Sequence, residues 1–484
     1  MTRRTGGAAA VAAIAAPMFM VALDNLIVTH ALPQVRAEFG GGQSQLQWVV
    51  NAYVLAFAGL LMTASALGDR FGRRRVFVVA VLLFTLASAW CATASSLGEL
   101  MAARVAQGAG AAAILPLSLT LTAAAVPAAH RNAAVGAWGG INGLGIALGP
   151  LVGGVVTETL SWHWVFWINV PVGLLVLPAV LWTVGESRGG AGVFDVPGAL
   201  LVTGGLVAAV WGVVNAAEAG WSSPLTVAAL AGAVALVAGF VLWQRRTPTP
   251  LVPLGLFRNG PFALSLVVSL AMYFGVFGSV FLLAQYMQGP LGYAPFEAGL
   301  RTLPWTAAPM VVVPVVSLLI DRVGGGRLQA LGCAMQAAAL AWLALAATAD
   351  MAYASMLPAL VVAGVGMGVV FAANPVVVIA SVSEDRHGTA SGVNNTVREF
   401  GGALGIAAIS TVFVVFHPVG AETDAAFVEA MRPAVLAGAV VTAAGAVAAL
   451  FIRRDRTPHP VAPTAAEAPA PAAPAPAPGP ARPS

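Results

Sequence analysis

The chain has 484 residues, of which 59% are hydrophobic and only 9% are charged, and its mean hydropathy is +0.87. This composition excludes a soluble globular protein and is typical of a protein that crosses the bilayer many times. The net charge of +4 does not indicate nucleic-acid binding, because the basic residues lie in short loops between apolar runs.

Catalytic and cofactor patterns are missing from the sequence. All 23 basic residues are arginine, so the chain lacks the lysine of a Walker A phosphate loop and any lysine for a Schiff base. The six histidines show no metal-ligand spacing, and no nucleophile is paired with a base. We therefore expect neither an enzyme nor a protein that binds a metal or a cofactor.

Apolar runs of about 18 to 25 residues recur along the chain, each long enough to cross a hydrocarbon core of about 30 Å. Fourteen such segments are predicted, centred near residues 20, 57, 85, 113, 145, 174, 206, 233, 273, 310, 338, 367, 404 and 442. The predicted fold class is thus an all-α polytopic membrane protein with 14 transmembrane helices. An even number of spans places both termini on one side of the membrane.

The arginines show which side that is. They concentrate in the gaps after even-numbered segments and in the two tails, whereas the other gaps carry few. By the positive-inside rule, both termini are expected in the cytoplasm. The bias toward Arg, Ala, Gly and Pro favours a GC-rich bacterial genome, so the predicted location is a bacterial cytoplasmic membrane.

A short motif, Asp-Arg-x-Gly, occurs at 69–72 and again at 321–324, in the gaps after the second and tenth segments. The recurrence predicts two pseudo-symmetric six-helix halves, with the seventh and eighth segments inserted between them and a substrate site at the interface of the halves. Chance recurrence of a turn motif is the alternative. The expected units are a bundle over 1–185, two inserted helices with linkers over 186–257, a bundle over 258–456 and a disordered Pro/Ala-rich tail over 457–484.

Two isolated charges stand inside apolar segments, Asp24 in the first and Arg104 in the fourth, and each costs at least a few kcal/mol in a bilayer. At about 1.5 Å per residue, both lie roughly 10 Å or less below the outer face, so they are predicted to pair. Such a pair could take up and release a proton if Asp24 reaches a central vestibule. A fixed structural ion pair is the alternative.

The fifth segment carries closely spaced small residues, which are Gly145, Gly149, Gly153 and Gly154, together with Pro150. Small residues four apart let two helices approach closely in lipid, and a proline bends the helix beside them. This pattern predicts a hinge and outer seal between the halves, with ordinary tight packing as the alternative.

The repeated turn places acids and cations at cytoplasmic helix ends. Its candidate gate residues are Asp69, Arg70, Gly72, Arg73, Asp321 and Arg322. Salt bridges here could clamp the two halves until the protein opens inward. The alternative is charge that serves only to orient the chain.

The thirteenth segment holds a second charged pair, Arg398 and Glu399. Neighbours on a helix lie about 100° apart, so the two cannot face one another squarely. Glu399 is expected near the midplane, where it could bind a cationic substrate or a proton, or form a structural pair. Candidate residues for the substrate cavity are Asn51, Tyr53, Asn142, Gln285 and Arg398, for each of which packing is the alternative.

Several of these stretches resemble motifs of the major facilitator superfamily, specifically of its fourteen-helix drug:proton antiporter branch. They are LDNLIVTHALP (23–33), SALGDRFGRRR (65–75), LMAARVAQGAG (100–110), GIALGPLVGG (145–154) and WHWVFWINVPVG (162–173). The resemblance implies proton-driven efflux of hydrophobic, often cationic or antibiotic-like compounds by alternating access. It further implies Asp24 as the proton-linked acid with Arg104 as partner, Asp69 and Arg73 as gate, and Gly149 and Pro150 as hinge.

The expected function is therefore proton antiport that exports small amphiphilic molecules, by a protein that works as a monomer with a small molecule, protons and the lipid bilayer as its partners. Two alternatives stay open, a proton-coupled importer and a membrane sensor that does not transport. Antiport moves protons opposite to substrate, symport moves them with it, and a sensor moves none.

Overall fold

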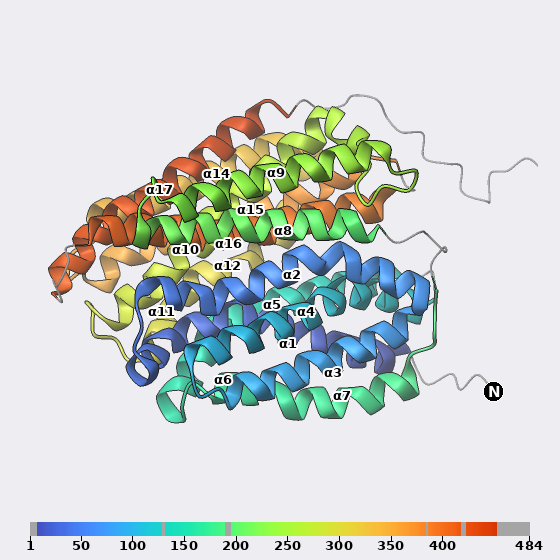
Figure 1. Ribbon diagram of the computed structural model, residues 1–484, viewed down its shortest axis with the longest axis horizontal. Helices are drawn as coiled ribbons and strands as arrows, with labels where there is room; N and C mark the ends of the chain where they lie inside the picture. Colours follow the sequence, from blue (N-terminus) through green and yellow to red (C-terminus); the bar gives the residue numbers. More distant parts are fainter. Residues whose placement is uncertain (1–6, 128–130, 189–194, 384–385, 418–422, 453–484) are drawn as a thin grey trace, which may run out of the picture.

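The computed structural model describes residues 7–127, 131–188, 195–383, 386–417 and 423–452, in which every regular element is a helix (Figure 1). The tail predicted over 457–484 lies outside these residues. Within them, 14 helical stretches are long and apolar enough to cross a membrane, which confirms the predicted number.

The N-terminal helices form one bundle, coloured blue to teal in Figure 1. It consists of α1 (Gly7–Phe39), α2 (Gln43–Phe71), α3 (Arg73–Ala92), α4 (Leu97–Ala125), α5 (Arg131–Thr159), α6 (Trp164–Trp167) and α7 (Asn169–Thr183). In this bundle α2 and α3 pack on α4, and α1 packs on α5.

The C-terminal helices form a second bundle, preceded by the short 3₁₀ helix η2 (Leu254–Arg258). Its members are α10 (Gly260–Gln288), α11 (Pro295–Thr306), α12 (Ala308–Ser317), α13 (Ile320–Val323), α14 (Gly325–Ala346), α15 (Tyr353–Ala380), α16 (His387–Phe416) and α17 (Asp424–Leu450). The tenth apolar segment, expected as one helix, is divided into α11 and α12 at Ala307. Pro304 and Pro309 flank the break, and the missing proline N–H groups explain it.

The two inserted helices, α8 (Val196–Ala219) and α9 (Pro224–Arg246), pack against each other, and α8 also contacts α2 and α16 (Figure 1). The Thr203 hydroxyl of α8 donates a hydrogen bond to the Gly59 carbonyl of α2 at 2.9 Å. Thr411 of α16 donates to the Val213 carbonyl of α8 at 3.0 Å. α8 therefore bridges the two bundles along one side.

Both copies of the Asp-Arg-x-Gly motif adopt the same turn. The glycine has a positive φ in each, 109° at Gly72 and 98° at Gly324, and it separates two consecutive helices. Residues that carry a Cβ atom rarely adopt such a positive φ, which explains why glycine occupies this position in both turns. The shared geometry favours a structural repeat over a chance recurrence.

Candidate functional site

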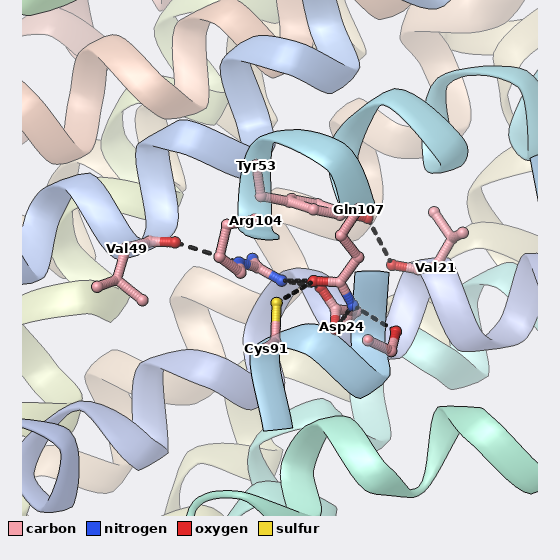
Figure 2. Close-up of polar contacts among 8 residues, drawn as sticks. Val21, Asp24, Val49, Tyr53, Cys91, Arg104 and Gln107 are labelled. Atoms are coloured by element: carbon pink, nitrogen blue, oxygen red, sulfur yellow. Dashed lines mark hydrogen bonds and ion pairs between the residues drawn. The ribbon is translucent and has the colours of Figure 1, made fainter. Parts of the chain in front are cut away.

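Asp24 of α1 lies in the interior of the first bundle and is fully buried (Figure 2). Nη1 of Arg104 donates a hydrogen bond to Asp24 Oδ2, so the predicted contact between these charges is confirmed. Nε2 of Gln107 donates to Asp24 Oδ1 at 3.0 Å, and Arg104 Nε donates to the Val49 carbonyl of α2 at 3.1 Å. This cluster ties α1, α2 and α4 together.

Two neighbours of this cluster support it. The Tyr53 ring of α2 lies 4.2 Å from the Arg104 guanidinium carbon, a cation–π contact, and the Tyr53 hydroxyl donates to the Val21 carbonyl at 3.5 Å. Gln107 also donates to Ser88 Oγ of α3 at 2.9 Å. We did not predict Gln107 from the sequence, although its place three residues after Arg104, on the same helix face, is a readable signal.

Two adjoining cavities with volumes of about 230 and 500 Å³ lie between the bundles. Asn25 lines the smaller one, whereas Asp24 lines neither. Consecutive helical side chains point about 100° apart, so with Asn25 toward the cavity Asp24 points back toward Arg104. The condition for proton exchange, that Asp24 reaches a central vestibule, is therefore not met in this conformation.

The cavity walls are contributed by both bundles, and several of the side chains that line them are aromatic. Their aromatic side chains are Phe57, Trp138, Tyr273, Phe277, Trp305 and Phe371. Of the predicted cavity residues, Asn142 and Arg398 line both spaces. Asn51, Tyr53 and Gln285 line neither: Asn51 is buried in the first bundle, Tyr53 packs on Arg104, and Gln285 donates to the Phe281 carbonyl of its own helix at 3.1 Å.

Arg398 borders both cavities. It donates hydrogen bonds to the Tyr273 hydroxyl and, at 3.1 Å, to Asn395 Oδ1, while its Nε has no partner in the described part of the chain. Its guanidinium carbon lies 4.5 Å from the centre of the Tyr273 ring and 5.6 Å from that of Phe371. These partners are neutral, so none of them balances the positive charge.

Glu399 borders the smaller cavity and is 7% exposed. Its Oε2 is buried and has no hydrogen-bond partner among the described residues. Within those same residues neither Glu399 nor Arg398 forms an ion pair. The predicted inability of the two neighbours to face one another is thus confirmed, and both line the smaller cavity.

One face of α5 packs on α1 through its glycines. A Cβ atom placed on Gly149 would lie 3.1 Å from Leu26 Cβ, and one on Gly153 would lie 2.8 Å from the Ile27 carbonyl oxygen. Gly145 makes a similar contact with Ala22, where the Cβ atoms would be 2.7 Å apart. These glycines therefore hold α5 against the part of α1 that surrounds Asp24.

The next face of α5 packs on α11 of the other bundle. A Cβ on Gly154 would overlap the Pro295 carbonyl, and one on Gly299 would overlap the Pro150 carbonyl. Oε2 of Glu158 accepts a hydrogen bond from the Phe296 amide at 2.9 Å. The bundles are thus in backbone contact at the arginine-poor ends of these helices.

The opposite end of α5 is open. A Cβ atom on Gly140 or Gly143 would meet nothing within 4 Å, and both residues line the larger cavity. The cavity also reaches Pro314, near the end of α12. It therefore extends toward the arginine-rich ends of the helices.

The predicted gate residues lie at those arginine-rich ends. Nε of Arg73 donates to Asp69 Oδ1 at 2.8 Å, and the Arg70 guanidinium lies 5.4 Å from the Phe71 ring centre. Both contacts stay within the first bundle, while Asp321 and Arg322 lie in α13 of the second. A clamp between the bundles stays a prediction.

The described residues include no group of three or more His, Cys, Asp or Glu that could hold a metal ion.

Comparison with known proteins identifies the family to which this chain is similar. The family model of the Major Facilitator Superfamily matches residues 14–406. The "Tetracenomycin C resistance and export protein" of Streptomyces glaucescens is 35% identical over 403 residues, which cover 83% of this chain and 74% of the relative. The "Multidrug efflux pump LfrA" of Mycolicibacterium smegmatis is 32% identical over 468 residues, covering 94% and 92%.

A solved structure shares the fold. The crystal structure of a bacterial homologue of the human lysosomal transporter Spinster, in an inward-facing and unoccupied conformation, matches with a TM-score of 0.66 at 15% identity. The match covers 93% of this chain and 98% of that one. On the family match, the identity to these relatives and the helical architecture, the chain belongs to the Major Facilitator Superfamily.

Proposed function

We propose that this protein exports small hydrophobic, antibiotic-like compounds across the cytoplasmic membrane in exchange for protons. The observation that carries the proposal is the cavity between the bundles, which is closed at the arginine-poor ends by α5 and α11. The cavity borders an acid, Glu399, whose Oε2 has no hydrogen-bond partner in the part of the chain that the structure describes. The relatives named above, an antibiotic export protein and a multidrug efflux pump, support the direction of transport.

With the arginine-rich ends in the cytoplasm, the cavity faces inward in this conformation. Substrate then enters from the cytoplasm or the inner leaflet and binds among the aromatic walls. Rocking of the bundles closes this side and separates α5 from α11, which exposes the cavity to the outside. The protein carries out this cycle as a monomer.

Two acids couple the cycle to protons. Glu399 binds either a proton or the positive group of a substrate, so that the two compete within the cavity. Asp24 takes a proton from outside once α5 has separated from α11. Protonation weakens its bond to Arg104, and α1 transmits the change to the outer seal through the glycine contacts of α5.

Substrate-driven proton movement tests this proposal against its alternatives. The protein is reconstituted into vesicles that contain a pH-sensitive dye, and ethidium, a hydrophobic cation, is added outside. Antiport predicts that the lumen becomes alkaline as ethidium enters, symport predicts acidification, and a sensor leaves the pH unchanged. Either of the latter two results overturns the proposal.

A further inference from the structure

We propose that the preferred substrates are aromatic molecules that carry both an anionic and a cationic group, with the anion on Arg398 and the cation on Glu399. This inference rests on the proposed function, because it assigns the substrate class of the same cavity. It starts from two residues of opposite charge that are neighbours in α16 and line the same cavity, and that form no ion pair with any described residue.

The positive half of the site is Arg398. A guanidinium stays charged at every physiological pH, and its planar set of donors matches a carboxylate or another flat anion. Its hydrogen-bond partners among the described residues, the Tyr273 hydroxyl and Asn395 Oδ1, are neutral, and its buried Nε has no partner there. An anionic group in the cavity would supply the counter-charge that stabilises a buried cation.

The negative half is Glu399, whose Oε2 has no partner in the described ranges. A ligand with only a cationic group would satisfy Glu399 but leave Arg398 beside a second positive charge. A ligand with only an anionic group would satisfy Arg398 but approach Glu399 with like charge. A ligand with both groups satisfies both residues, and this electrostatic complementarity selects it.

The side chains that line the cavity indicate the shape and polarity of the uncharged part of the ligand. Tyr273 stacks between Phe277 and Phe371, with ring centres 5.4 and 5.5 Å apart and interplanar angles of 15° and 23°. All three rings line the smaller cavity. Flat apolar ligands pack well on such a surface, and the cavity volumes of 230 and 500 Å³ together suit a drug-sized molecule.

The order of contacts follows from the lining. Arg398 borders both cavities, whereas Glu399 borders only the smaller one. A ligand that arrives through the larger cavity therefore meets Arg398 first. Its cationic end then passes on toward Glu399, while its anionic end stays at the junction of the two spaces.

Binding of three matched acridines to the purified full-length protein tests the proposal. They are 9-aminoacridine, a cation, acridine-9-carboxylate, an anion, and 9-aminoacridine-4-carboxylate, which carries both charges at neutral pH. Equilibrium dialysis read by acridine fluorescence gives each dissociation constant. We expect the doubly charged compound to bind about tenfold more tightly than either of the others, because a tenfold ratio of dissociation constants corresponds to the free energy of one charge-assisted hydrogen bond.

Variants assign each charge to its residue. Arg398→Gln is expected to weaken binding of the doubly charged compound and of the carboxylate about tenfold. It should strengthen binding of the amine, because the like charge beside the amine is removed. Glu399→Gln is expected to weaken the doubly charged compound and the amine instead. Arg398→Lys keeps the charge but loses the planar set of donors, so its affinity for the doubly charged compound should lie between those of Arg398→Gln and the wild type. A melting temperature near the wild-type value confirms that each variant is folded.

The proposal is overturned if the doubly charged acridine binds no more tightly than 9-aminoacridine, if Arg398→Gln weakens all three compounds equally, or if none of the three binds saturably. Dialysis involves no proton gradient, so each of these binding results can be told apart from a failure of proton-coupled transport. Proton-coupled ethidium transport with the wrong acridine pattern would contradict only the substrate class. The expected acridine pattern without proton movement would contradict only the antiport.

Discussion

Gly299 of α11 lies directly against the Pro150 carbonyl of α5, with no room for a side-chain carbon between the two helices. Gly154 has the same relationship to Pro295 one turn further along α5. Two glycines, one from each bundle, thus let the backbones touch where the cavity is closed. Conversion to an outward-open state must break both contacts.

A larger residue in this seal should open it. Gly299→Val forces extra carbons into a backbone contact, and overpacking of this kind costs about 1–3 kcal/mol in the closed state. That penalty shifts the equilibrium toward the outward-open conformation by roughly tenfold. The measurement is labelling of Thr306→Cys, a residue that lines both cavities, by a membrane-impermeant maleimide applied outside the cell.

The matched control is Gly232→Val in α9, where a Cβ would meet nothing within 4 Å. It should leave the labelling rate at the level of Thr306→Cys alone. Equal rates in the Gly299→Val and Gly232→Val backgrounds would show that the α5–α11 contact does not close the cavity.

The buried pair should behave as a unit in stability measurements. Arg104→Leu leaves the Asp24 carboxylate buried without its cation, which costs about 3–5 kcal/mol. Asp24→Asn keeps an acceptor for Arg104 and should cost less. The double variant Asp24→Asn/Arg104→Leu should therefore melt at a higher temperature than Arg104→Leu alone. Melting temperatures that fall additively in purified protein would contradict a coupled pair.

Asp195 anchors the inserted helices and predicts a pH dependence. Its carboxylate accepts hydrogen bonds of 2.6 to 3.4 Å from the Gly198 amide, Trp243 Nε1, Gln244 Nε2 and the Leu251 amide. Burial raises the pKa of Asp195, but these hydrogen bonds outweigh burial and hold the pKa below its usual range. An unfolded aspartate has a pKa of about 3.9, so the stabilisation is present above that pH and is lost as the pH falls through the lower folded value.

Asp195→Asn should accordingly cost about 1–3 kcal/mol at neutral pH, because the amide cannot accept all of these bonds. The difference in melting temperature from wild type should begin to shrink below about pH 4, where the unfolded aspartate protonates, and should keep shrinking as the pH falls through the lower pKa of the folded protein. Asp350→Asn, at an exposed loop position, is the control and should have little effect. A difference that has already disappeared at pH 4 would be inconsistent with a low pKa for Asp195.

The sequence predicts the helices well because apolar length is a property of each segment by itself. All fourteen segments correspond to candidate spans, and the matching depths of Asp24 and Arg104 correctly predict their contact. The division of the tenth segment was missed, although Pro304 and Pro309 mark it.

The sequence does not predict how each helix is rotated about its axis, and so it does not predict which side chains point into the cavity. Whether Asp24 or Asn25 borders the cavity depends on a rotation of about 100°, which only packing against the other helices decides. The same limit explains why Tyr53 and Gln285, both plausible cavity residues, line neither space. The position of α8 between the bundles is likewise a result of tertiary packing, since its composition is that of any apolar span.

The most direct test of the antiport account is substrate-driven proton movement by Asp24→Asn in reconstituted vesicles, compared with Glu429→Gln, which removes an exposed acid of α17. The account predicts that Glu429→Gln still makes the lumen alkaline when ethidium is added outside. Asp24→Asn should remain folded and bind ethidium but produce no proton movement. Proton movement by Asp24→Asn at the wild-type rate would contradict the role of this acid in coupling.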